Sequence, residues 1–263
     1  MLRSLLERLS RDVVLVRRLP NEFGGLSLFV SPDASLRFWK RDLAMADPLL
    51  LEAAKALVHP GDGVWDVGAN VGLFSFAAAS LSGDRGRVLA IEPDPWLCNL
   101  LRRSAELNAS LPCAVSVLQV AVTDRTGDVI LKIARRGRAA NYLAGREPST
   151  QTGGIRNAIQ VPSVTLDRLL DNWPAPAVVK IDVEGAEDSV LRGAQRLLKQ
   201  VRPRILCEVS SVAQTEVSAA FHAAGYAIYD AAKPAEERVR IRHCAWNTIA
   251  LPVEAAPDGP SGD

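Results

Sequence analysis

The stretch VWDVGANVGLFSF, from Val64 to Phe76, decides the fold. An apolar run ends in the carboxylate of Asp66, and Gly68, Asn70 and Gly72 follow before the chain turns apolar again. This pattern predicts a strand that enters a tight turn and continues as a helix, because glycine permits backbone conformations that other side chains forbid. The turn accounts for the glycines but not for the acid.

Strand-like and helix-like segments alternate on both sides of this stretch. Strands are predicted at residues 64–67, 88–91, 115–120, 178–183, 204–209, 226–230 and 245–251, and helices at 73–81, 96–107, 186–199 and 212–223. Such alternation predicts an α/β fold with a doubly wound, mostly parallel sheet covered by helices on both faces. Because no helix-length segment separates the last two strands, we expect the final strand to be antiparallel.

Length and composition set the limits of the protein class. The 263 residues are 48% hydrophobic and 23% charged, which is typical of one large domain with a small appendage. We expect a helical and strand-containing appendage at 1–58, a main domain at 59–252 and a disordered tail at 253–263. A net charge of +1 gives no field that would recruit nucleic acid. The four cysteines are far apart and lack the spacing of a zinc site or a disulfide framework.

The N-terminal stretch, residues 1–20, has leucines at helical spacing and five arginines. It predicts a basic amphipathic helix that packs one face on its own domain or, alternatively, touches a membrane surface or a partner. Charges interrupt this stretch too often for a secretory signal, and no apolar run reaches the length of a transmembrane helix. We therefore expect a cytoplasmic protein.

Four acids fall at or near the ends of different predicted strands: Asp66, Glu92, Asp182 and Glu208. In a doubly wound sheet, ligands bind beyond the carboxyl ends of the strands, where the strand order reverses. We therefore expect these carboxylates to converge on one rim. Carboxylates so close together need cations or hydrogen-bond donors beside them.

The nature of the ligand follows from the acids. A dinucleotide template, GxGxxG, fails at Asn70 and Leu73, and Asp66 would place negative charge beside a pyrophosphate. S-adenosylmethionine has an ammonium and a sulfonium instead of phosphates, so a carboxylate at the strand end attracts it. Glu92 is placed to accept hydrogen bonds from both ribose hydroxyls of that cofactor.

The segments DVGANVG, AIEPDP, VAVTD, VTLDRLL, KIDVEGAEDSVLRGA and ILCEV occur in this order. Over roughly residues 60–252 the chain thereby resembles FkbM-type methyltransferases, S-adenosylmethionine-dependent enzymes that methylate mainly hydroxyl oxygens. The resemblance implies a seven-stranded, Rossmann-like methyltransferase sheet with an antiparallel last strand. It also implies a cofactor site made of Asp66, Gly68, Ala69, Asn70 and Gly72 in the loop, Glu92 and Pro93 at the ribose, and Ala121 near the adenine.

The run VVKIDVEG contains the candidate catalytic groups. Lys180 and Asp182 share one side of a strand that should be buried on both faces, and buried charges are costly unless they are paired or used. We expect Asp182 to accept the acceptor's hydroxyl proton, Lys180 to tune its charge, and Glu184 or Glu208 to hold the acceptor. A magnesium ion bound by Asp182, Glu184 and Glu208 is the alternative. Among the three histidines, His243 is the best placed for a catalytic role.

Residues 135–160 form a polar, glycine-containing insertion in which we expect an acceptor-recognition loop. Arg135, Arg136 and Arg138 could bind a phosphate or carboxylate on a small-molecule acceptor, such as a nucleotide-sugar or a carrier-linked intermediate, or form a solvated face. The sequence thus predicts an O-methyltransferase acting on a sugar, glycolipid or natural-product intermediate. The alternatives are a non-catalytic nucleoside-binding or interaction domain and, less favoured because GxGxxG is missing, a dehydrogenase.

Overall fold

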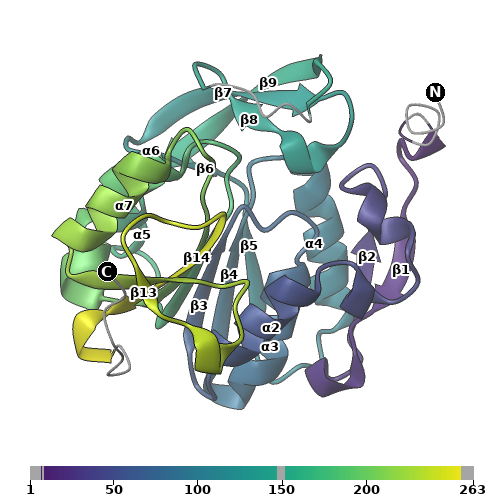
Figure 1. Ribbon diagram of the computed structural model, residues 1–263. Helices are drawn as coiled ribbons and strands as arrows, with labels where there is room; N and C mark the ends of the chain where they lie inside the picture. Colours follow the sequence, from purple (N-terminus) through teal and green to yellow (C-terminus); the bar gives the residue numbers. More distant parts are fainter. Residues whose placement is uncertain (1–6, 8, 147–151, 256–263) are drawn as a thin grey trace.

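A large twisted sheet forms the centre of the protein (Figure 1). The structure is a computed structural model, and it describes residues 7, 9–146 and 152–255. In these ranges the sheet has eight strands in the order β13-β12-β14-β11-β10-β3-β4-β5. Their bounds are β3 Gly63–Val67, β4 Arg87–Ile91, β5 Val115–Leu118, β10 Val178–Ile181, β11 Arg204–Glu208, β12 Tyr226–Asp230, β13 Arg240–Ile241 and β14 Asn247–Pro252. All seven predicted strands are present, and the two-residue β13 is added at one edge.

The strand directions confirm the predicted topology. β3 pairs in parallel with β4 and with β10, and β10 pairs in parallel with β11. β14 runs antiparallel to both β11 and β12. The chain moves outward from β3 to β5 and then returns to β10 on the other side of β3. The strand order therefore reverses between β3 and β10, which is where a doubly wound sheet binds its ligand.

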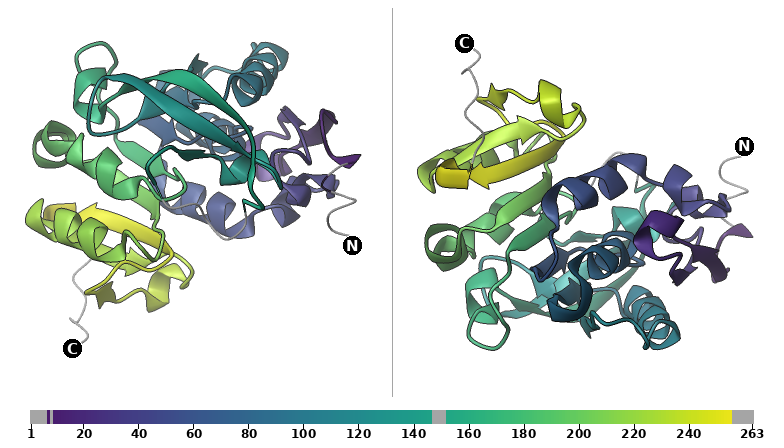
Figure 2. Two further views of the ribbon diagram at one scale, coloured as in Figure 1. Left: turned by 90° about the horizontal axis from the view of Figure 1, so that it is seen from above. Right: turned by 90° about the horizontal axis from the view of Figure 1, so that it is seen from below.

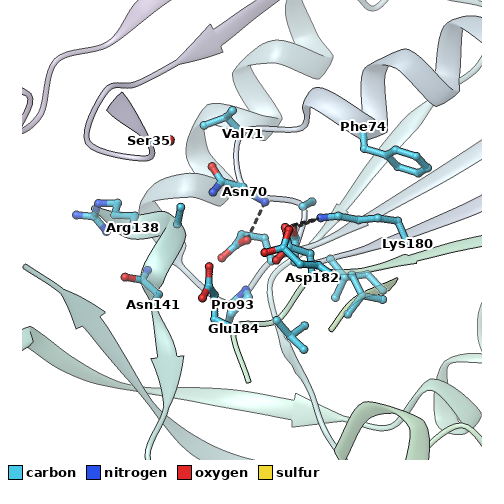
Figure 3. A pocket seen from close by; sticks show the side chains of 18 of the residues that line it. Ser35, Asn70, Val71, Phe74, Pro93, Arg138, Asn141, Lys180, Asp182 and Glu184 are labelled. Atoms are coloured by element: carbon cyan, nitrogen blue, oxygen red, sulfur yellow. Dashed lines mark hydrogen bonds and ion pairs between the residues drawn. The ribbon is translucent and has the colours of Figure 1, made fainter. Parts of the chain in front are cut away.

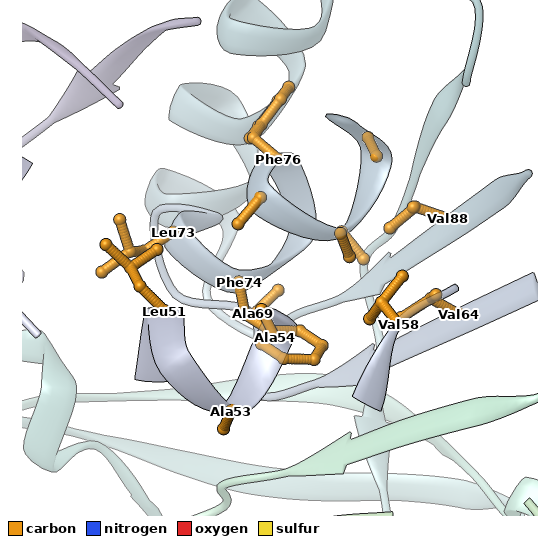
Figure 4. Close-up of a cluster of buried hydrophobic side chains, with 14 of the residues drawn as sticks. Leu51, Ala53, Ala54, Val58, Val64, Ala69, Leu73, Phe74, Phe76 and Val88 are labelled. Atoms are coloured by element: carbon orange, nitrogen blue, oxygen red, sulfur yellow. The ribbon is translucent and has the colours of Figure 1, made fainter. Parts of the chain in front are cut away.

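Helices cover both faces of this sheet (Figure 2). One face carries α2 Pro48–Leu57, α3 Leu73–Ser82 and α4 Pro95–Leu107, and the other carries α5 Leu166–Leu169, α6 Glu187–Arg192 and α7 Gln214–Ala223. Successive strand residues alternate between the two cores: Val64 packs with α2 and α3, as Figure 4 shows, whereas Trp65 packs on the other face. This alternation is the two-residue period of a strand buried on both sides.

The predicted helix at 186–199 is wrong in its middle. α6 ends at Arg192, and a separate π-helix spans Leu197–Val201. Gly193 lies between them, and a Cβ atom there would sit 2.4 Å from the carbonyl oxygen of Thr123. The helix is interrupted where the backbone after β6 approaches it so closely that only glycine fits.

The N-terminal appendage is a small antiparallel pair of strands followed by α2. β1 Leu15–Arg18 pairs with β2 Ser27–Val30, so the predicted helix is wrong over residues 15–18, where the β-branched Val16 favours a strand. The remaining helix prediction falls partly on residues 1–6 and 8, outside the described residues. Of the predicted tail, residues 253–255 form a 3₁₀ turn, and 256–263 also lie outside the description. Short 3₁₀ turns span Asn21–Phe23, Leu36–Trp39, Leu43–Met45, Gly83–Arg85, Arg138–Ala140 and Ala235–Glu237.

A second sheet is formed by β6 Ala121–Val122, β7 Gly127–Ala134, β8 Tyr142–Leu143 and β9 Ile155–Val164, in the order β6-β9-β7-β8. Of the predicted acceptor-recognition loop, residues 135–160, only β8 and the first part of β9 belong to this sheet, whereas β6 and β7 precede the loop. Residues 147–151 lie outside the description. Figure 1 shows this sheet across one end of the central sheet, where it can cover a ligand bound at the strand ends. Throughout the described chain, no helix is long and apolar enough to cross a membrane.

Candidate active site

A cavity opens at the carboxyl ends of β3, β4 and β10, beneath the second sheet (Figure 3). Ten of the residues predicted for the site line it: Gly68, Ala69, Asn70, Glu92, Pro93, Ala121, Lys180, Asp182, Glu184 and Glu208. The second sheet contributes the apolar Leu131 and Leu143 and the aromatic Tyr142. The cavity thus joins the predicted cofactor residues and the predicted catalytic residues in one space.

The loop after β3 has three residues with positive φ angles, a backbone conformation that most side chains disfavour. Gly68 has φ +75°, and a Cβ atom there would lie 1.8 Å from the carbonyl oxygen of Asp182. Gly72, at φ +89°, precedes α3 and packs tightly against Leu101 and Phe76. Asn70 has φ +54°, a left-handed conformation that asparagine tolerates better than most residues. The glycines bring this loop into contact with the segment after β10.

Glu92 lies at the floor of the cavity and is only 6% exposed. Its Oε2 accepts a hydrogen bond from the backbone N–H of Asn70 at 2.9 Å, and its Oε1 accepts one from the N–H of Asp94 at 2.9 Å. Burial raises the pKa of Glu92 to about 8 despite these two bonds. A carboxylate has about four acceptor positions, so both oxygens can take further donors from a ligand.

The open acceptors at this site fit S-adenosylmethionine. The side-chain oxygen of Asn70 is buried without a hydrogen-bond partner in the described chain, and together with Glu92 it calls for a ligand rich in donors. The ribose hydroxyls and the ammonium of S-adenosylmethionine are such donors. Ala121, Leu131 and Leu143 supply an apolar wall suited to an adenine ring.

Asp66 does not reach the rim on which the sequence placed it. It is fully buried, its Oδ2 accepts a hydrogen bond from the Ser75 hydroxyl at 2.6 Å, and its Oδ1 lies 3.2 Å from Lys180 Nζ. The predicted convergence of four carboxylates is therefore wrong for Asp66, while Glu92, Asp182 and Glu208 all line the cavity. Asp66 supports the loop from below, and its direct contact with the cofactor stays a prediction.

Lys180 connects the cofactor loop to Asp182. Its Nζ donates a hydrogen bond to the carbonyl oxygen of Gly68 at 2.7 Å and lies 3.4 Å from Asp182 Oδ2. Burial by itself would lower the pKa of Lys180, but the carboxylates of Asp66 and Asp182 raise it above its ordinary value. The lysine thus stays charged and holds the two segments together.

Asp182, Glu184 and Glu208 form a carboxylate cluster on the side of the cavity next to Lys180. One oxygen from each lies within 4.8 Å of the others. Burial, followed by the charge of Asp182, raises the pKa values of Glu184 and Glu208 to about 8. Glu184 also has φ +51°, a backbone conformation that costs free energy and is concentrated at functional sites.

These pKa values predict that the ligand-free protein loses stability as the pH rises from about 5 to about 8. Glu92, Glu184 and Glu208 keep a proton in the folded chain up to pH 8, whereas the unfolded chain releases it near 4.5. The folded state then binds more protons than the unfolded state, so the free energy of unfolding falls with increasing pH. Denaturant unfolding at pH 5, 6.5 and 8 measures this slope, which Glu208→Gln should reduce. A stability that rises over this range would contradict the assignment.

Two arginines of the insertion fasten it to the rest of the protein. Arg138 Nε donates to Asp33 Oδ2 at 3.0 Å and its Nη1 to Asp94 Oδ2 at 2.6 Å, while Arg156 makes two hydrogen bonds to Asp33. Asp33 and Asp94 are almost completely buried, and Arg138 also lies over the Trp96 ring. Since Asp94 holds Glu92 through its N–H, the network ties the appendage, the insertion and the cofactor site together.

Replacing Arg138 by alanine should therefore destabilise the protein by roughly 3 kcal/mol, because two buried carboxylates lose a partner. Arg135→Ala and Arg136→Ala are matched controls. Both side chains are exposed and neither lines the cavity, so each should change the free energy of unfolding by less than about 0.5 kcal/mol. Urea unfolding of the three variants measures the difference. Equal, small effects would show that the network contributes little. Of the two alternatives for the three arginines, Arg135 and Arg136 fit the solvated face, whereas Arg138 lines the cavity.

Some cavity residues were not predicted. Ser35 and Arg37 come from the appendage, and Trp246 from the segment before β14. No motif marks them, because their position depends on how the appendage and the last strand pack on the sheet. His243, the alternative base, is exposed and does not line the cavities found in the described chain.

The chain is similar to a known protein family. The family described as the methyltransferase FkbM domain matches residues 66–228, which is more than half of the chain. The chain belongs to the FkbM methyltransferase family. Membership in this family supports S-adenosylmethionine-dependent methyl transfer and disfavours a dehydrogenase.

Individual relatives are more distant. Hexuronic acid methyltransferase AglP of Haloferax volcanii is 29% identical over 155 residues, which is 58% of this chain and 56% of that protein. The chain thus spans about half the length of this curated relative. The crystal structure of methyltransferase FkbM from Methylobacillus flagellatus is 16% identical with a TM-score of 0.43, covering 84% of this chain and 58% of that one. Fibrillarin of Aeropyrum pernix with bound S-adenosyl-L-methionine is 15% identical with a TM-score of 0.44, covering 78% and 74%. Likenesses at this level do not bear on substrate or mechanism.

Proposed function

We propose that this methyltransferase transfers the methyl group of S-adenosylmethionine to a hydroxyl oxygen of a sugar or sugar-like acceptor. The observation that carries this proposal is the carboxylate cluster of Asp182, Glu184 and Glu208, which lines the same cavity as Glu92 and Asn70. Hydroxyl groups are the acceptors that such a cluster suits, because carboxylates can both orient a hydroxyl and take its proton. The named activity of the Haloferax relative on a hexuronic acid supports a sugar.

The cofactor supplies an electrophilic methyl group bonded to a sulfonium sulfur. In an in-line displacement the bond from the acceptor oxygen to the methyl carbon forms as the carbon–sulfur bond breaks, so the protein chiefly aligns the acceptor and removes its proton. Asp182 is the proton acceptor in this proposal. Among the described residues it is the member of the cluster with a cation at ion-pair distance, since Lys180 lies 3.4 Å away.

Glu184 and Glu208 hold the acceptor rather than deprotonate it. With pKa values of about 8, they carry protons at neutral pH and can donate hydrogen bonds to oxygens of the acceptor as well as accept them. The different surroundings of the three carboxyl groups support this division of roles. Within the cluster, the ion pair with Lys180 is made by Asp182.

A metal-assisted version is the second candidate. The three carboxylates approach one another within 4.8 Å, and oxygen ligands of this kind are those that magnesium prefers. A bound cation would lower the pKa of the acceptor hydroxyl and thereby replace the base. We favour the version without a metal, because Asp182 already has a cationic partner in Lys180.

Transfer of a labelled methyl group tests the proposed function. The purified chain is incubated with methyl-labelled S-adenosylmethionine and a panel of sugars and sugar acids, and the product is analysed by mass spectrometry and NMR. We expect the label in a methyl ether of a sugar hydroxyl. Label in an N-methyl or C-methyl group, or transfer to non-sugar acceptors alone, would contradict the proposal.

A further inference from the structure

A second cavity adjoins the first on the side of the carboxylate cluster. Its volume is about 580 Å³, which is within the range of small-molecule sites. Asp182, Glu184 and Glu208 line both cavities, so the cluster stands between the cofactor side and this second space. The position is that of an acceptor site.

Trp246 lies at the edge of the second cavity. The residue is 56% exposed, although a large aromatic ring usually gains free energy from burial. Its backbone carbonyl accepts a hydrogen bond from Val209 N–H at 2.7 Å, and its neighbour Asn247 pairs with Glu208 across β14 and β11. The backbone of Trp246 is thus fixed close to Glu208, and its largely exposed side chain lines the cavity.

Arg37 lies on the wall that the N-terminal appendage contributes. Its Nε donates to the Ser35 hydroxyl at 3.1 Å, and its Nη1 pairs with Asp47, whose other oxygen caps α2. No hydrogen-bond partner of Nη2 is found in the described chain. Arg37, Glu184 and Glu208 line the same second cavity, so the guanidinium shares this space with the cluster. Ser35 and Asp47 therefore orient an arginine that keeps one donor group for a ligand.

We infer that the second cavity binds an acidic sugar, whose ring stacks on Trp246 and whose anionic substituent pairs with Arg37. This inference rests on the proposed function and names the acceptor class within it. The apolar C–H face of a sugar ring suits an indole face, and a planar guanidinium suits a carboxylate or a phosphate. The hydroxyls of the same ring then lie toward the carboxylate cluster.

The charge balance of the cavity allows an anion there. Two cations, Lys180 and Arg37, line the second cavity together with the cluster, and Lys180 pairs with Asp182 at 3.4 Å. The anionic substituent therefore meets Arg37 in a cavity whose carboxyl groups have cations beside them. Asp47 offsets part of the charge of Arg37, so the pairing should add specificity more than a very high affinity.

Binding of three related sugars tests the inference. Methyl glucuronide, methyl glucoside and glucose 6-phosphate are titrated by calorimetry into the full chain saturated with S-adenosylhomocysteine. Trp246→Ala should weaken all of them about tenfold, because each loses the same ring contact. Arg37→Gln should weaken the acidic sugars about tenfold or more and the glucoside less than about threefold. Whether the glucuronide or the phosphate loses more identifies the anion that the site prefers.

Two variants serve as matched controls. Trp39, 41% exposed, and Arg41, also exposed, lie in the same appendage and line neither cavity, so Trp39→Ala and Arg41→Gln should leave all three affinities unchanged. Unchanged affinities in Trp246→Ala, equal losses for acidic and neutral sugars in Arg37→Gln, or no binding of any sugar to the unaltered protein would overturn the inference. If the sugars bind as expected but none receives a methyl group on oxygen, the proposed function fails and the binding site stands.

Discussion

Replacing Glu92 by alanine should weaken the binding of S-adenosylmethionine and of S-adenosylhomocysteine by at least about a hundredfold. We expect Glu92 to accept two hydrogen bonds from the ribose in the complex, and these donors favour its charged form. A hydrogen bond to a charged group contributes roughly 1.5–3 kcal/mol. The same carboxylate also accepts the N–H groups of Asn70 and Asp94, so its loss loosens the cofactor loop as well. Calorimetric titration of the purified variant with S-adenosylhomocysteine measures the change.

Glu187→Gln is the matched control for this experiment. Glu187 is a glutamate as buried as Glu92, it accepts hydrogen bonds from Gly185 N–H and from the Ser210 hydroxyl, and it lines neither cavity. Its replacement should affect folding stability but not cofactor affinity. A Glu92→Ala variant that keeps its affinity within about threefold, or a protein that prefers NAD, would refute the assignment of Glu92.

The central sheet and the cofactor loop could be predicted from the sequence because their signals are local. These signals are apolar runs of strand length, the glycines after Asp66 and the spacing of the helices. Each can be recognised without knowing which residues are in contact in the folded protein. Glu92 and Asp182 follow directly after β4 and β10, so their meeting needs only the rule that parallel strands end at the same edge. These predictions depend on neighbours in sequence, and the structure confirms the placement.

The predictions that the structure contradicts concern residues whose positions are determined by contacts with residues far away in the sequence. Asp66 was placed at the rim because it ends an apolar run, yet Ser75 and Lys180 bind it below the loop. The second sheet was not predicted because charged residues obscure the alternation of β7 and β9, which pair with each other over eight residues. Arg138 could not be distinguished from Arg135 by sequence, since its role comes from Asp33, 105 positions away. Arg37 and Trp246 could not be predicted for the same reason, because tertiary packing brings them to the cavity and no sequence motif marks them.

Replacing Asp182 by asparagine should lower the turnover number by about a hundredfold or more while leaving cofactor affinity nearly unchanged. Asparagine keeps the size of the side chain but cannot accept the hydroxyl proton, and the loss of a positioned base typically costs 10²–10⁴ in rate. Asp182 lines the cavity without touching Glu92 in the described contacts, so the ribose site should persist. Single-turnover methyl transfer and calorimetry with S-adenosylhomocysteine separate the two effects.

The same variant, combined with a chelator, separates the base from the metal. If Asp182 acts as the base, the unaltered enzyme should keep its activity in EDTA, and Glu184→Gln and Glu208→Gln should be milder than Asp182→Asn because these two side chains only hold the acceptor. If a cation held by the cluster acts instead, EDTA should abolish activity, magnesium should restore it, and all three substitutions should be about equally damaging. Since burial raises the pKa of Glu208 to about 8, a metal would also have to displace its proton, so the metal-dependent rate should rise as the pH approaches 8. Full activity of Asp182→Asn in EDTA would exclude both versions and leave alignment of the acceptor as the source of catalysis.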